Sequence, residues 1–198
     1  NFKNPNMPRM IELEAGRGND LSADMNRLIA ELLSKISSVF QSDYYKERRK
    51  KLVEEFQVKQ KDIISKFEKD IAGEGFTMVR MQVGPIIKPE LLPVVDGNPV
   101  NFPQLQKLVE EGKMPKENIK KYEESAEKLS ERMQVVYSQV KDLERAANKR
   151  LEQLDSDTVS PLIHDLIEEI ERKYGNEALS KELDEVEETL MQKLDLFS

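Results

Sequence analysis

The sequence predicts an all-α fold: an elongated antiparallel coiled-coil arm on a helical-bundle base, with a small β-hairpin tip. Three features support this prediction: a long heptad stripe, a second helical segment that can face it, and a short β-forming stretch between the two. The stripe continues for about five heptads, which indicates a coiled coil instead of an ordinary surface helix. Its apolar residues recur at spacings of three or four: Ile119, Tyr122, Ala126, Leu129, Met133, Val136, Val140, Leu143, Ala147, Leu151 and Leu154.

The composition also favours helices with narrow apolar seams over a large globular core. Hydrophobic residues make up 38% of the chain, charged residues 35% and aromatic residues 6%, which is a polar balance for a folded domain. The net charge of −7 argues against nucleic acid as a partner. The absence of Cys excludes disulfides and thiolate metal sites and fits a reducing, cytoplasmic location. No apolar run reaches the roughly 18 residues that span a bilayer, so we expect no membrane partner.

The first part of the chain is expected to run outward along the arm. Residues 1–19 form an extended lead-in in this prediction, because prolines and glycines interrupt it, with a short strand at 10–13. Asp20 is placed to cap the first helix. The outgoing helices then cover 20–72, with a weak point near 41–43 where the first helix can end.

The middle of the chain changes character and is expected to form the tip, over 73–114. Gly73 can end the outgoing helix. The β-forming residues at 76–83 lead into a Gly-Pro turn at 84–85. We therefore predict a β hairpin, followed by a short helix over 103–112.

The last part is expected to return to the base, which completes a single helical domain over 20–198. The return helix covers 115–154, and the C-terminal helices of the base cover 156–198. The seam is interrupted just before Pro161, which favours a new helix start there. Asn176 is expected to cap the last helix. Because this layout brings both chain ends to the base, it is typical of an insertion in a larger polypeptide.

Residue patterns that carry catalysis or bind cofactors are not found. No phosphate-binding G-x-x-x-x-G-K-[ST] motif occurs, and we assign no catalytic residue and no cofactor. His164 is the only histidine, and Glu168 follows at helical spacing. Two such ligands make a poor metal site without Cys or further His. We therefore assign no metal and interpret His164 as a side chain on the surface or at the rim of the bundle.

A basic run at 46–51 has two interpretations. It can contact an anionic partner, or it can form a solvated helix face in which Glu54 and Glu55 pair with Lys50 and Lys51. No aromatic side chains are interleaved with the cations, which argues against a nucleic-acid surface. We favour the solvated face.

The tip holds the candidate binding residues. It carries more apolar side chains than a two-stranded hairpin can bury by itself. Either the short helix at 103–111 covers them, or some stay exposed and contact unfolded polypeptide, a role that suits adaptable Met side chains. The candidates for contact with substrate are Phe76, Met78, Met81, Ile86 and Ile87.

Several segments resemble the helical domain of Lon-like proteases of the LonC type. The lead-in at 1–9 and the Leu-Glu-Ala-Gly-Arg-Gly segment at 13–18 are similar to the family's NFxxPxxPR and LPAGxG motifs. The run at 40–49 is similar to its F-x-S-x-x-Y-x-x-R-R pattern, and 194–197 match the point where its helical insertion returns to the core. Glu14 departs from the pattern, since the family usually has Pro there.

The resemblance implies a fold and a role. It places the helical domain as an insertion in an AAA+-type module, with residues 1–19 leading in from that host core. The module is fused to a serine endopeptidase with a Ser–Lys dyad in a later domain, so this fragment itself is expected to be non-catalytic. The parent is expected to be a homo-hexamer that receives unfolded proteins at its entrance. The resemblance leaves open whether the parent binds ATP, because the family's ATPase motifs can be degenerate.

A second function class fits the same composition and heptads. In this alternative the chain is a stand-alone coiled-coil scaffold or holdase-like protein unrelated to proteolysis. Only the lead-in and closing segments separate the two hypotheses. The first hypothesis expects recognition and gating of unfolded or damaged proteins for degradation, with the rest of the parent protease as the other partner.

Overall fold

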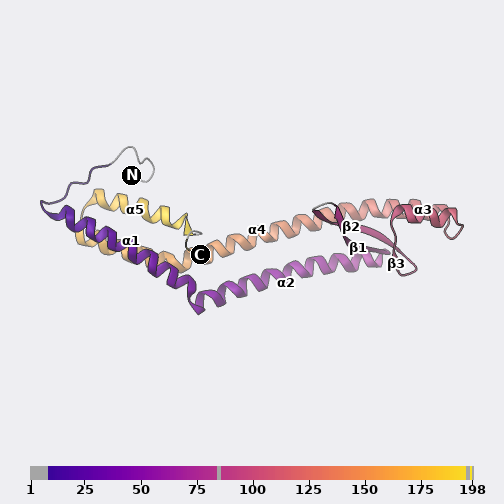
Figure 1. Cartoon of the computed structure of the whole chain (residues 1–198), viewed down its shortest axis with the longest axis horizontal. Coiled ribbons are helices and arrows are strands. Elements are labelled where there is room, and N and C mark those ends of the chain that lie inside the picture. Colours follow the sequence, from indigo (N-terminus) through magenta and orange to yellow (C-terminus); the bar gives the residue numbers. More distant parts are fainter. Residues whose placement is uncertain (1–8, 84–85, 195–196, 198) are drawn as a thin grey trace. The chain divides into compact units, whose positions relative to one another are not determined.

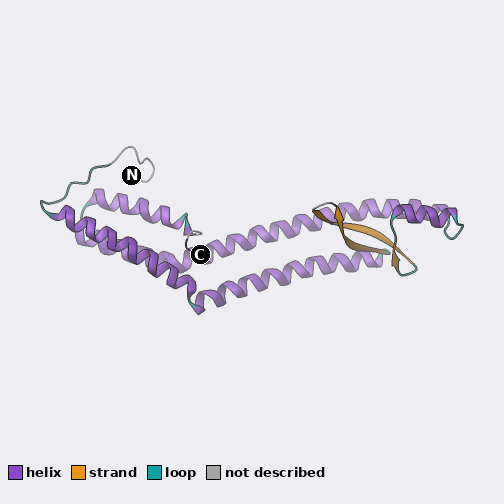
Figure 2. Cartoon of the chain, viewed as in Figure 1, coloured by secondary structure: helices purple, strands orange, loops and turns teal. Residues whose placement is uncertain are grey.

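The computed structural model describes residues 9–83, 86–194 and 197. These residues form five helices and a small three-stranded antiparallel sheet, which confirms the prediction of a mostly helical chain with a β hairpin (Figures 1 and 2). The elements in chain order are α1 (Arg17–Gln41), α2 (Asp43–Gly73), β1 (Phe76–Val83), β2 (Ile86–Val95), β3 (Asn98–Pro99), α3 (Phe102–Glu110), α4 (Lys116–Tyr174) and α5 (Glu177–Met191).

The chain divides into two compact units. Unit 1 contains the residues up to 53 and those from 148 onward, and unit 2 contains residues 54–147. Helices α2 and α4 contribute residues to both units. The coiled-coil arm and the single domain over 20–198 stay predictions.

Unit 1 is a helical bundle built from α1, the start of α2, the end of α4 and α5. Each helix contributes one apolar face at helical spacing, so the faces bury one another. The buried apolar side chains of this unit form a single cluster: Leu28, Leu32, Ile36, Phe40, Tyr45, Leu154, Val159, Ile163, Leu166, Ile167, Ile170, Tyr174, Leu179, Leu183 and Leu194.

The helix ends in unit 1 follow local capping chemistry. α1 ends at Gln41, and the Ser42 hydroxyl then accepts a hydrogen bond from the Tyr45 amide (3.3 Å), which supports the start of α2. The side-chain oxygen of Asn176 accepts from the Leu179 amide at 3.0 Å, so its predicted capping of α5 is confirmed. The prediction for Asp20 is wrong. α1 begins earlier, at Arg17, and Asp20 lies in its first turn, where a carboxylate favours the helix dipole.

Two further boundary predictions differ from the structure. Residues 10–13 are not in a strand. The break before Pro161 is also absent, because α4 continues through this residue to Tyr174. Proline inside a helix costs about 3 kcal/mol. Here Val159 and Ile163 are fully buried on either side of Pro161, while Pro161 itself is exposed, so burial of the flanking turns offsets the lost hydrogen bond.

A buried carboxylate, Asp24 of α1, joins α1 to the end of α4. Its oxygens accept hydrogen bonds from the Tyr174 hydroxyl at 2.6 Å, from Arg27 at 2.8 Å and from the Lys173 ammonium. The hydrogen bonds from Lys173 and Tyr174 lower the pKa of Asp24. Burial and the bond to Asp24 raise the pKa of the Tyr174 hydroxyl to about 12. The charge of Asp24 is therefore fully compensated in unit 1.

Unit 2 contains the heptad stripe of α4 as far as Ala147, and the last two residues of the stripe lie in unit 1. Every residue of that stripe is at least partly buried, whereas most of the positions between are exposed. Leu129 is fully buried and packs in a cluster with Phe67 and Ile71 of α2 and with Phe76 and Leu91 of the sheet. The same cluster is extended by partly buried side chains of β1 and α4: Met78, Tyr122, Ala126, Met133 and Val136.

The sheet in unit 2 is a hairpin with a two-residue third strand. β1 and β2 are antiparallel, and Phe76 lies opposite Pro93 while Val83 lies opposite Ile86. The side chains of Phe76 and Met78 both point to the cluster, as the period of two in a strand requires. The Phe76 ring meets the Tyr122 ring of α4 edge-on, with 5.9 Å between the ring centres.

No described helix combines the length and the low charge that crossing a bilayer would require.

The pairing of Asp24 makes the stability of unit 1 depend on pH. Because folding lowers the pKa of this carboxyl, its contribution is complete above the ordinary value of 3.8 and is lost as the pH falls through the lowered value. We expect Asp24→Asn to reduce the free energy of unfolding near neutral pH, and the difference from wild type to shrink in acid. Circular dichroism during urea titration at several pH values measures this.

Asp184→Asn is the matched control, since Asp184 is an exposed aspartate of the same unit. We expect it to change stability by less than about 0.5 kcal/mol at every pH. A difference between wild type and Asp24→Asn that does not change with pH would contradict the paired-carboxylate account.

Truncation of one side chain in the apolar cluster of unit 2, Leu129, is expected to lower the stability of the protein strongly. Leu129→Ala removes a fully buried side chain, so we expect a loss of about 2–5 kcal/mol in the free energy of unfolding. Val135→Ala, on the same helix but 57% exposed, should cost less than about 1 kcal/mol. Urea titration followed by circular dichroism measures both, and equal effects would show that Leu129 is not a core residue.

Candidate functional site

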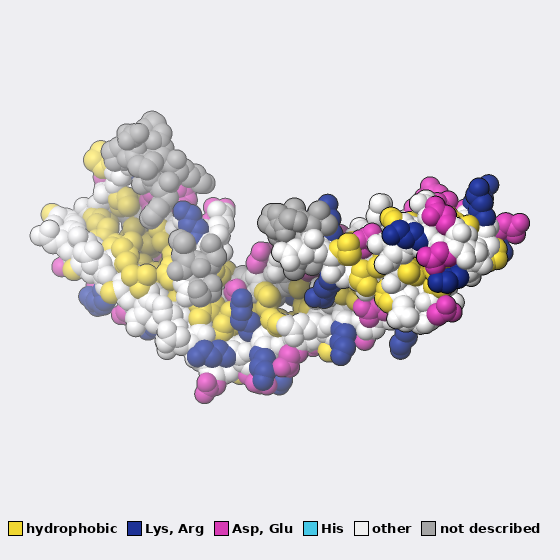
Figure 3. Space-filling view, turned by 45° about the vertical axis from the view of Figure 1, so that its right-hand side comes forward, with side chains coloured by type: hydrophobic (Ala, Val, Ile, Leu, Met, Phe, Trp, Pro, Cys, Tyr) yellow, Lys and Arg dark blue, Asp and Glu magenta, His cyan; other side chains and the backbone are white. Residues whose placement is uncertain are grey.

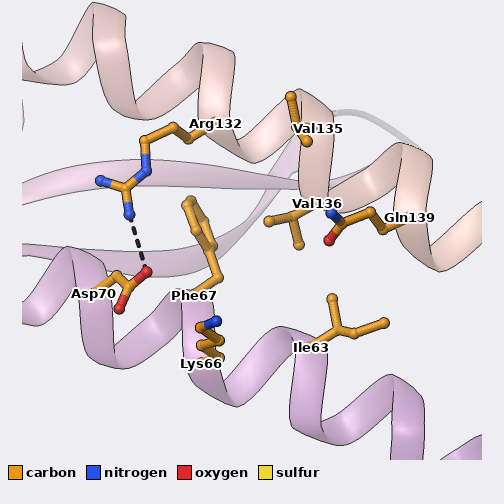
Figure 4. A pocket seen from close by; sticks show the side chains of 8 residues that line it. All are labelled: Ile63, Lys66, Phe67, Asp70, Arg132, Val135, Val136 and Gln139. Atoms are coloured by element: carbon orange, nitrogen blue, oxygen red, sulfur yellow. Dashed lines mark hydrogen bonds and ion pairs between the residues drawn. The ribbon is translucent and has the colours of Figure 1, made fainter.

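A groove lies between α2 and α4 within unit 2, with a volume of about 370 Å³ (Figure 4). That volume falls in the range of pockets that bind ligands. Its lining has the same spacing on both helices, i, i+3, i+4 and i+7, so one face of each helix is used. The lining residues are Ile63, Lys66, Phe67 and Asp70 on α2, and Arg132, Val135, Val136 and Gln139 on α4.

The groove is apolar inside. Phe67 is buried and belongs to the cluster of unit 2, and Val136 packs against the same cluster. Ile63 is partly buried, and its side chain points toward Val136 in Figure 4. Val135 is 57% exposed, so apolar surface stays open to solvent. The groove is therefore an extension of the core that the protein itself leaves partly uncovered.

Charged side chains border the groove. The Arg132 guanidinium donates to Asp70 at 3.0 Å and also bonds the Glu74 carboxylate. This links α4 to the end of α2. Lys66 and Gln139 are exposed. Lys66 has no ion pair within residues 9–83, 86–194 and 197. Figure 3 shows both signs of charge intermixed on the visible face of the molecule, with hydrophobic side chains between them.

The predicted tip residues occupy different environments. Phe76 is 1% exposed and is part of the core, whereas Met81 is 44% exposed. Met78 is partly buried and packs against the cluster that contains Phe67. Ile86 and Ile87 belong to β2, but their side chains lie outside the described residues. Phe76 and Met78 therefore belong to the apolar cluster of unit 2, whereas Met81 lies on the surface.

The groove is not predicted by the patterns in the amino-acid sequence. Val136 belongs to the predicted heptad stripe, and Ile63 is an apolar residue of the second helical segment. A signal was present in the pattern, because α4 has an apolar residue at Val135 beside the stripe residue Val136. A seam that is wider than its partner can cover leaves apolar surface exposed.

The other charged features of the sequence lie in unit 1 and have local partners. His164 is 62% exposed at its side chain and faces Glu187 of α5 at 3.6 Å, not Glu168. In the basic run, Lys51 pairs with Glu47 at 3.4 Å, and Arg49 donates to the Tyr45 hydroxyl at 3.0 Å. Over the described residues, no three His, Asp or Glu side chains gather as metal ligands do.

Comparisons with known proteins give one partial match. The family model described as the Lon-like LonC helical domain matches residues 1–28. This segment contains two of the motifs on which the resemblance rests and the first half of α1. Searches of the curated proteins and of the solved structures gave no match. The match supports a Lon-like helical domain at the N-terminal end of the chain, and it does not include the groove.

The ion pairs of Arg132 predict a small effect on stability. Arg132, Asp70 and Glu74 have side chains that are 43–46% exposed, so solvent screens their attraction. We expect Arg132→Gln to lower the free energy of unfolding by less than about 1 kcal/mol, with a smaller difference at high salt. Urea titration at low and high salt measures this, and a larger loss that salt does not change would contradict it.

Proposed function

We propose that this chain is a non-catalytic, Lon-like helical domain that binds unfolded polypeptide for a protease. The observation that carries the proposal is the open apolar groove of unit 2, with Val135 exposed on its edge and Phe67 buried on its floor. The family match over residues 1–28 supports the link to Lon-like proteins.

The exposed apolar surface of the groove favours binding of unfolded polypeptides over folded proteins. Folded proteins bury most of their large aliphatic and aromatic side chains, whereas unfolded chains expose them. A groove of about 370 Å³ accepts such side chains, and the flexible, exposed Met81 adds adaptable surface in the same unit. Binding of this kind depends on hydrophobic burial and not on a particular sequence.

The chemistry of the groove fits binding without bond cleavage. None of its eight lining side chains is Ser, Cys or His, so no nucleophile and base are paired there. Its acidic group, Asp70, is already bonded to Arg132. In this proposal, peptide cleavage belongs to a Ser–Lys dyad in another domain of a cytoplasmic, homo-hexameric parent. The helical domain recognises or gates unfolded and damaged proteins before degradation.

A pair of charge substitutions tests the groove. We expect this chain to bind fluorescently labelled α-lactalbumin that is kept unfolded by reduction and carboxymethylation, but not the native form. Val135→Asp places a carboxylate on the groove edge, so we expect about tenfold weaker binding, equal to about 1.4 kcal/mol. Fluorescence anisotropy measures the affinity, and circular dichroism checks that the variant is folded.

Val58→Asp is the matched control, because Val58 is a 59% exposed valine of α2 in unit 2 that does not line the groove. Its binding should equal that of wild type. Met81→Ser should weaken binding less than Val135→Asp does, since only its own exposed surface is lost. If the unfolded protein does not bind, or if both aspartate variants bind equally, the proposed function is wrong.

A further inference from the structure

The sheet of unit 2 has an open edge on β1. The strand order is β1-β2-β3, so among the described residues β1 has a partner strand on one side only. An unpaired strand edge presents a row of backbone N–H and C=O groups, which another extended chain can pair with. Most folded proteins block such edges with proline, charge or a covering segment, so it matters which backbone groups point outward here.

The hydrogen bonds of the hairpin show which groups these are. The Val94 amide donates to the Gly75 carbonyl at 2.8 Å, so Val94 and Gly75 point toward each other across the hairpin. In antiparallel pairs the direction alternates along each strand. With this register, Thr77 and Val79 point their amides toward β2. Met78 and Arg80 therefore point their amides and carbonyls to the open edge.

The opposite edge of the hairpin is blocked. The outward carbonyl of Pro93 accepts from the Val100 amide at 2.9 Å, where the chain passes β3. Further along the same edge, Pro89 lies across from Arg80 and has no N–H to donate. β1 contains no proline. The hairpin thus protects one edge and leaves the other competent for pairing.

Two of the outward residues of β1, Met78 and Arg80, have free backbone amides in the described part of the chain. The amides of Met78 and Arg80 make no hydrogen bond there, and Arg80 is exposed and has no ion pair with a described residue. From these observations we propose that β1 binds an extended segment of unfolded polypeptide as an added strand. This inference rests on the proposed function and specifies how the polypeptide is held.

The side chains of β1 define the chemistry of that segment. Directly opposite residues of paired strands share a face. An acidic side chain opposite Arg80 would therefore meet a guanidinium that makes no ion pair with a described residue; it acts electrostatically on the Tyr137 hydroxyl. Apolar side chains opposite Val79 and Met81 would cover the outer face of the sheet, where Met81 is 44% exposed. The favoured segment is thus extended and alternates apolar and acidic residues.

A second copy of this chain fits the edge less well. Two antiparallel β1 strands would place both Arg80 side chains on the same face, within a few residues of each other, and like charges there are destabilising. An acidic, extended polypeptide offers the complementary charge. A single strand addition also keeps its side chains next to the apolar cluster that holds Met78.

Hydrogen exchange of the unaltered protein gives the first test. We expect carboxymethylated, unfolded α-lactalbumin to slow exchange of the Met78 and Arg80 amides by about tenfold or more, because these amides become hydrogen-bonded. The Thr77 and Val79 amides are bonded to β2 in both states, so they should change little. Exchange measured by NMR resolves this alternation. Equal change at all four amides, or none while the probe binds, overturns the proposal.

Two substitutions at one position give the second test. Arg80→Pro removes the outward amide at an edge position that tolerates proline, and we expect about tenfold weaker binding of the same probe with unchanged circular dichroism. Arg80→Gln keeps the amide and loses the charge, so we expect about threefold weaker binding. Equal losses for both variants would assign the effect to charge and overturn strand addition.

The outcomes also separate this inference from the proposed function. If the probe binds through Val135 while Arg80→Pro binds as well as wild type, strand addition is wrong and the groove is still the binding site. If the probe does not bind wild type, the proposed function is wrong. If the free protein is a dimer that Arg80→Pro dissociates, a second copy occupies the edge, and the proposal is overturned in favour of self-association.

Discussion

The packing of Leu129 against Phe67 and Ile71 is the interaction on which unit 2 depends. It holds α4 against the end of α2, and it supplies the surface that Phe76 and Met78 of the hairpin cover. Phe67 and Val136 belong to this packed region and also line the groove. The inner part of the groove is therefore preformed, because Phe67 is buried and Val136 is partly buried in the same cluster. A preformed apolar surface of this kind costs little ordering when a ligand binds.

The two units differ in whether particular polar groups have hydrogen-bond partners. In unit 1 the buried carboxylate of Asp24 accepts hydrogen bonds from three side chains. These bonds replace the hydrogen bonds to water that the carboxylate loses on burial. In unit 2 the outward amides of Met78 and Arg80 lack partners in the described chain. Saturated networks fix a structure, whereas unpaired backbone groups at an accessible edge favour association. This contrast supports the proposal that polypeptide binds to unit 2.

The family match and the groove are independent observations. The described part of the matched segment, residues 9–28, lies in unit 1, and every residue of the groove lies in unit 2. The match indicates the kind of protein to which the N-terminal segment is similar, and the groove indicates what the middle of the chain can bind. The family match and the groove together support the proposal of an accessory domain that binds other polypeptides. Such a domain contributes binding, while the reacting groups of a protease lie elsewhere.

The local features of this protein can be predicted from its amino-acid sequence. The helical stripes, the hairpin and the Asn176 cap follow from residues within a few positions of one another, and such spacing can be recognised without a partner. The other features depend on contacts between residues that are far apart in the chain. Pro161 is carried inside α4 because distant helices bury its neighbours, and Phe76 is buried because Tyr122 and Leu129 cover it. The groove depends on which faces of α2 and α4 pack together, and the open edge of β1 depends on the register of the hairpin. Neither can be predicted from the spacing of residues along the chain.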